Sequence, residues 1–145
     1  MYSDVRAFLL EFVPRSSAAL SLSMKQRDQF GKLDDIEAKK NFRHFMNRMN
    51  QRAFGNRHHR FGKKIEVLPV LERSYGGRLH YHAFIENPFD DLANLKGEIS
   101  WAWSKTRWGY DEIDVQETYN DNGWLTYITK SQLFDNIDVE NMHRV

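Results

Sequence analysis

Apolar residues and histidines alternate along one short stretch of the chain, Leu79-His80-Tyr81-His82-Ala83-Phe84-Ile85-Glu86. A period of two is typical of a β-strand, in which successive side chains point to opposite faces of the sheet. His80 and His82 therefore share one face, and we expect the residues between and beside them to pack against helices on the other. Two neighbouring imidazoles on an exposed sheet face predict a pair of metal ligands.

The turn before this stretch decides which residue lies opposite His80. Gly76-Gly77 indicates a β-hairpin. A two-residue loop at these glycines pairs Arg73 with His80 and turns Glu72 to the other face. A three-residue loop, Tyr75 to Gly77, pairs Glu72 with His80. Only the second register places this carboxylate beside the histidines.

A carboxylate is the third ligand that Mg²⁺ or Mn²⁺ prefers, because both are hard cations. Glu72 is the first candidate, since it is the nearest carboxylate on the partner strand. Glu86 shares the histidine face but lies farther along the strand, and it ranks second.

The other strands follow from the same alternation. Ala18 to Met24 and Glu112 to Thr118 alternate, and Lys64 to Arg73 forms the first arm of the hairpin. Pro69 lacks an N–H, so it indicates an edge strand or a bulge.

Helices are predicted between the strands. Asp34 begins a capping box, followed by apolar residues at helical spacing up to a stop at Gly55. Asp90 is the expected cap of a second helix, and Asn122 to Gln132 forms a third. The order β-α-β-β-α-β-α predicts an α+β fold: an antiparallel sheet with His-x-His on a central strand and helices packed on one face.

Composition narrows the class of protein. The chain has 145 residues, of which 41% are apolar, which is enough to build the core of one domain spanning residues 1–145. It has no cysteine, so disulfides and thiolate zinc sites are excluded. No apolar run reaches membrane-spanning length, and the N-terminus has neither a signal nor a transit pattern. We therefore expect a cytoplasmic protein.

Positive charge is concentrated between Lys39 and Lys64, where His44, His58 and His59 also lie. A basic stretch of this kind can follow a phosphate backbone, although a solvated helix face followed by a loop gives the same pattern.

A third feature is Tyr127-Ile128-Thr129-Lys130. In a helix, positions three apart share a face, so the hydroxyl of Tyr127 and the ammonium of Lys130 project together. Phenol is a poor nucleophile at neutral pH because its pKa is about 10. A metal that polarises a phosphate, with a cation alongside, makes attack feasible.

These three motifs, in this order, resemble the HUH endonuclease superfamily, specifically single-tyrosine rolling-circle replication initiators (Rep proteins). Ala19-Leu20-Ser21-Leu22-Ser23 resembles the hydrophobic first motif, and the His-x-His and Tyr-x-x-Lys motifs resemble the second and third. The chain departs from the family in having Tyr81 between the histidines and serines in the first motif. The resemblance spans about residues 18–132.

The resemblance implies a mechanism. Tyr127 would attack a DNA phosphate, leaving a covalent 5′-phosphotyrosine and a free 3′-OH, and the reverse reaction would rejoin the ends. His80, His82 and Glu72 would hold Mn²⁺ or Mg²⁺, and Lys130 would position the phosphate. The substrate would be single-stranded DNA at an origin or nick site, with unwinding supplied by a helicase in trans or by a longer chain. The host would be bacterial or archaeal, with a plasmid, phage or mobile element as the source.

Aromatic residues divide into two expected groups. Trp108 is a candidate for stacking on DNA bases. We expect Trp101, Trp103 and Trp124 to pack in the core.

Two other functions remain open. One is a single-stranded nucleic-acid-binding domain without catalysis, since such domains also use an antiparallel sheet backed by helices. The other is a metal-dependent phosphoesterase that uses water. It would need the histidines but not Tyr127, and it would leave no covalent adduct.

Overall fold

The computed structural model describes residues 17–118 and 136–144. Four strands form an antiparallel sheet in the spatial order β4-β5-β1-β6. They are β1 (Ser17–Met24), β4 (Val67–Arg73), β5 (Leu79–Glu86) and β6 (Gly109–Glu117). The predicted α+β class is confirmed, and the His-x-His strand, β5, lies inside the sheet.

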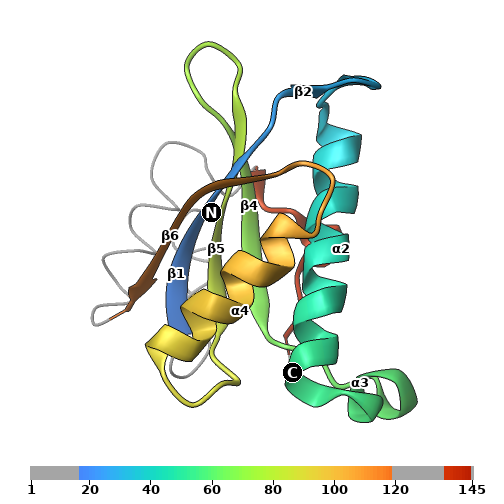
Figure 1. The fold of residues 1–145 in the computed structure, drawn as a ribbon, viewed down its shortest axis with the longest axis vertical. Coiled ribbons are helices and arrows are strands. Elements are labelled where there is room, and N and C mark those ends of the chain that lie inside the picture. The colour runs from blue at the N-terminus through green and yellow to red at the C-terminus, as the bar shows by residue number, and fades with distance from the viewer. Residues whose placement is uncertain (1–16, 119–135, 145) are drawn as a thin grey trace, which may run out of the picture.

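Two helices cover one face of this sheet (Figure 1). Helix α2 (Asp35–Phe54) links β1 to β4, and α4 (Leu92–Ser104) links β5 to β6. Because β5 lies between β1 and β4, the topology is a split β-α-β arrangement. The core lies between sheet and helices. There Tyr81 of β5 stacks on Phe42 of α2, with ring centroids 4.4 Å apart.

The helix starts follow side-chain caps. Asp34 Oδ1 accepts a hydrogen bond from Glu37 N at 2.8 Å, which confirms the first predicted cap. The cap of α4 is Asp91 rather than the predicted Asp90. Asp91 Oδ1 accepts from Asn94 N at 2.8 Å. Two adjacent aspartates offer the same chemistry, and only the backbone conformation selects between them.

Several short elements were not predicted. They are β2 (Arg27–Asp28) and β3 (Gly31–Lys32), which pair as a small hairpin, α3 (Asn56–Phe61), and the 3₁₀ turn η2 (Val139–Asn141). The predicted helix over residues 122–132 lies outside the described residues. Within the described residues, no helix has the length and hydropathy needed to cross a membrane.

Strand limits differ from the predictions at two points. Strand β4 begins at Val67 rather than Lys64, since Ile65 N donates instead to Asn50 Oδ1 of α2 at 2.7 Å. Strand β6 begins earlier than expected, at Gly109, which pairs with Met24 of β1.

Pro69 lies on an edge strand, as predicted. The outer edge of β4 is partly paired with the C-terminal residues, because Ile137 bridges to Val70 and His143 bridges to Val67. Pro69 still takes part, since its carbonyl accepts from Asp138 N at 2.9 Å.

The tryptophans correct two expectations. Trp103 is buried in the core, as predicted, but Trp101 is 40% exposed and lies beside the guanidinium of Arg52. Trp108 is not available to stack on bases. It is only 1% exposed, and Arg107 covers its ring at 4.4 Å. Trp124 lies outside the described residues.

Candidate metal centre

The hairpin between β4 and β5 has the three-residue loop. Ser74 N donates to Arg78 O at 2.9 Å, closing a loop over residues 75–77. Gly76 and Gly77 have φ of 97° and 87°, which favours glycine at both positions. Glu72 is therefore paired directly with His80, and the predicted register is confirmed.

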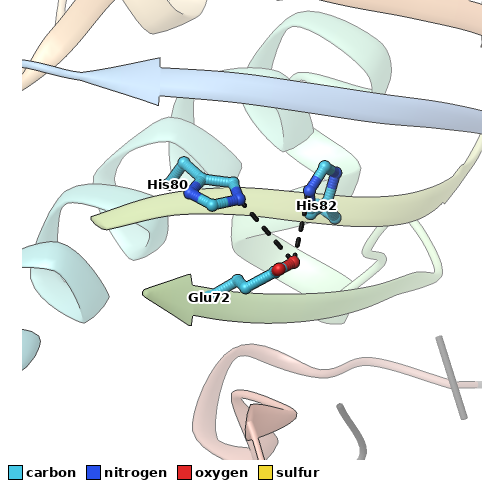
Figure 2. A group of neighbouring side chains, drawn as sticks. All are labelled: Glu72, His80 and His82. Atoms are coloured by element: carbon cyan, nitrogen blue, oxygen red, sulfur yellow. Dashed lines mark ion pairs between the residues drawn. The ribbon is translucent and has the colours of Figure 1, made fainter. Parts of the chain in front are cut away.

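This register brings one carboxylate and two imidazoles together (Figure 2). Glu72 Oε2 lies 3.6 Å from His80 Nε2 and 3.3 Å from His82 Nε2. The two rings are almost perpendicular, with centroids 4.9 Å apart. The three side chains are 16–25% exposed, so the group is accessible from solvent but partly sheltered.

The geometry fits a divalent cation. One ligand atom from each of the three residues lies within 4.8 Å of the others. In an octahedral site with ligands at about 2.1 Å, neighbouring ligand atoms are about 3.0 Å apart, so the observed separations need little adjustment. Glu72 Oε2 is buried and has no partner with hydrogen-bond geometry among the described residues. An orphaned carboxylate oxygen facing two imidazoles is a natural cation ligand.

The protonation state of His82 favours metal binding. Burial lowers its pKa and the neighbouring His80 lowers it further, while Glu72 acts in the opposite direction. His82 is therefore neutral at neutral pH, and a neutral imidazole is the form that binds a metal.

Ser21 is a site residue whose role was not predicted. It lies on β1 directly opposite His82, and its Oγ is 3.0 Å from His82 Nδ1. When Nδ1 carries the proton it donates to Ser21 Oγ, which leaves the Nε2 lone pair directed at the site of Glu72. The signal was present in the serines of the first motif, but the β1–β5 register was needed to see it.

A groove of about 440 Å³ adjoins the histidine pair across β1 and β6. Its polar lining comes from Ser21, Ser23, Arg78, His80, Glu112 and Asp114. Among the described residues, Arg78 is the one Lys or Arg in this lining, and its guanidinium is tethered to Met24 O at 3.3 Å. The groove is therefore more acidic than basic. Sequence reasoning missed Glu112 and Asp114 as neighbours of the histidines.

The second-ranked ligand, Glu86, has a different role. Its Oε1 accepts from Glu66 N at 3.0 Å, at the opposite end of β5 from His80. Tyr127 and Lys130 lie outside the described residues, so their predicted roles stay predictions.

Comparison with known families gives one result. A family model for replication-associated proteins of the ORF2 type matches residues 18–132, which include β1, the triad and the Tyr-x-x-Lys motif. No curated protein and no solved structure matches the chain.

Proposed function

The chain belongs to this family of ORF2-type replication-associated proteins, and we propose that it nicks and rejoins single-stranded DNA through a covalent 5′-phosphotyrosine intermediate. The observation that carries this proposal is the triad of Glu72, His80 and His82 on one sheet face. A replication-associated protein that nicks an origin needs a site that polarises a phosphate, and this triad has the ligands for it.

A divalent ion, Mn²⁺ or Mg²⁺, bound by the triad would polarise the scissile phosphate and stabilise the charge that develops on it. The carboxylate of Glu72 and the neutral imidazoles of His80 and His82 would hold this ion. Ser21 would keep His82 in the tautomer that exposes Nε2. Arg78 places a cation beside the same groove, where it would attract a neighbouring phosphate.

Tyr127 would supply the nucleophile. Its hydroxyl loses a proton and attacks phosphorus, the bond from phosphorus to the 3′-oxygen breaks, and that oxygen takes up a proton. The product is a 5′-phosphotyrosine and a free 3′-OH. Because the phosphodiester energy is kept in the protein link, attack by the 3′-OH restores the strand. Lys130 would help to position the phosphate.

Chain connectivity supports this role for Tyr127. The described chain leaves β6 at Thr118 and is next described at Asn136, beside β4 at the opposite edge of the sheet. Helices α2 and α4 cover one face (Figure 1). A connection over the other face would carry Tyr127 past the triad.

The wider setting follows from the same proposal. Residues 1–145 would act as one HUH-type endonuclease domain on single-stranded DNA at an origin, with a helicase acting in trans. The reaction would take place in the cytoplasm of a bacterial or archaeal host.

The experiment is a nicking assay on a pool of single-stranded oligonucleotides with Mn²⁺. We expect cleavage by the unmodified protein, and none in EDTA or with Tyr127→Phe, which removes only the attacking oxygen. Cleavage that persists undiminished in EDTA contradicts the metal role. Full cleavage by Tyr127→Phe makes water the nucleophile and identifies a phosphoesterase. Binding without any cleavage identifies a non-catalytic module.

A further inference from the structure

Charge is distributed very unevenly over the molecule. From Ala38 to Ile65 the chain carries nine Lys and Arg residues and no Asp or Glu. The neighbourhood of the triad has the opposite character, since Glu72, Glu112 and Asp114 all lie there. Phosphates are repelled by such a face in the absence of a bound cation. Electrostatic affinity for DNA must therefore come largely from elsewhere.

The most exposed part of the basic region is the α3 arm, which we define as residues 55–64. None of the residues of α3 is buried. Figure 1 shows α3 at the far end of α2, away from the tip of the β4–β5 hairpin. Its exposed cations are Arg57, Arg60, Lys63 and Lys64, and Phe61 beside them is 77% exposed.

The α3 arm has a defined structure. Gly62 ends α3 in the left-handed region, with φ of 65°, and its N–H donates to His58 O at 3.1 Å. His58 Nδ1 lies 3.1 Å from Lys63 O, so the ring ties the turn together. Arg57 and Lys63 both approach the ring of Phe54, at 5.9 and 5.1 Å from its centroid. The cations are thus partly ordered before any partner binds.

These cations are not neutralised by neighbours. Among the described residues, no carboxylate lies within 4 Å of the charged groups of Arg57, Arg60 or Lys63. Elsewhere exposed arginines are paired, for example Arg52 with Glu98 at 2.8 Å and Arg73 with Asp35 at 2.8 Å. Unpaired like charges held close together repel one another, and a polyanion relieves that repulsion.

We propose that the α3 arm binds the phosphate backbone of double-stranded DNA outside the nick site. The choice of DNA as the polyanion rests on the proposed function. The duplex form follows from the arm itself. Surfaces for single strands stack successive bases on several aromatics, whereas Phe61 is the one Phe, Tyr or Trp in the arm.

The position of the arm sets a length requirement. The arm lies before the start of β4 at Val67, and Glu72 lies five residues farther along this strand. At about 3.3 Å per residue this separation is at least about 17 Å. That equals about five base pairs at about 3.4 Å per pair. A duplex flank shorter than this does not bridge the two regions.

The test is fluorescence anisotropy with a labelled 20-base-pair duplex of random sequence, from 50 to 200 mM NaCl in EDTA. Omitting the divalent metal keeps the triad out of the measurement, so its result is independent of nicking. We compare the unmodified protein with Arg57→Ala/Arg60→Ala/Lys63→Ala. The matched control is Arg27→Ala/Lys32→Ala/Lys105→Ala, which removes the same charge from exposed sites outside the arm.

We expect the arm variant to bind the duplex at least ten-fold more weakly. Its slope of log affinity against log salt should be shallower by about 2.7, because each lost phosphate contact removes about 0.9. The control should change both quantities much less, and the melting temperatures of all three proteins should agree. Three results would each overturn the proposal: an equal loss in the control, an equal loss with a single-stranded 20-mer, or tighter binding to phosphatidylserine vesicles than to duplex.

Discussion

Among single residues, the strongest result is the pairing of Glu72 with His80. The sequence predicted both histidines on one face, because alternation in a strand leaves no other arrangement. It left the third ligand open, since loops of two and three residues are both compatible with Gly76-Gly77. The structure selects the three-residue loop, and the carboxylate of Glu72 then faces both imidazoles.

Replacing Glu72 tests the triad directly. Glu72→Gln keeps the shape of the side chain but removes its charge, so we expect Mn²⁺ affinity to fall at least ten-fold, measured by isothermal titration calorimetry. The matched control is Glu86→Gln, at the other end of β5, which should bind Mn²⁺ like the unmodified protein. The reverse pattern, with Glu86→Gln defective and Glu72→Gln normal, would assign the third ligand to Glu86.

Between elements, Tyr81 explains a departure from the resembled family. Its ring faces the helices, and its hydroxyl donates to Asp138 Oδ2 at 2.7 Å. Asn141 Nδ2 donates to the same oxygen. A tyrosine between the two histidines thus joins the central strand to the C-terminal residues beside β4. The sequence could not reveal this contact, because it joins residues 57 positions apart.

This contact predicts a specific response to alkaline pH. Burial and the adjacent Asp138 raise the pKa of Tyr81 far above its ordinary value. The folded protein therefore keeps a proton that the unfolded chain releases above about pH 10. The stabilisation is complete below that pH and is lost at about 1.4 kcal/mol per pH unit above it.

The comparison is with Tyr81→Phe, by urea unfolding between pH 7 and pH 11. At pH 7 the substitution should cost about 1–3 kcal/mol, because a buried carboxylate loses a donor. The difference between the two proteins should stay constant to about pH 9 and shrink above pH 10. A difference that stays constant up to pH 11 would show that the hydroxyl of Tyr81 is not held by Asp138.

Across the whole molecule, the sequence predicted the sheet, its helix-covered face and the His-x-His strand, since these follow from periodicity. It did not predict the contact of Ser21 with His82 or the acidic groove, since both depend on which strands become neighbours in space. The base-stacking role predicted for Trp108 was wrong, because an aromatic in a polar segment is expected to be exposed until its packing is known. The concentration of positive charge was visible in the sequence, and the structure locates it away from the triad.

The central claim is that the triad and Tyr127 form one nicking site. The most direct measurement is tandem mass spectrometry of the protein after incubation with single-stranded DNA and Mn²⁺, with Tyr119→Phe as a matched control. The account predicts a nucleotide adduct on Tyr127 in both proteins, and no adduct in EDTA or with His82→Ala. Nicked DNA without any adduct, or an adduct on another tyrosine, would contradict it.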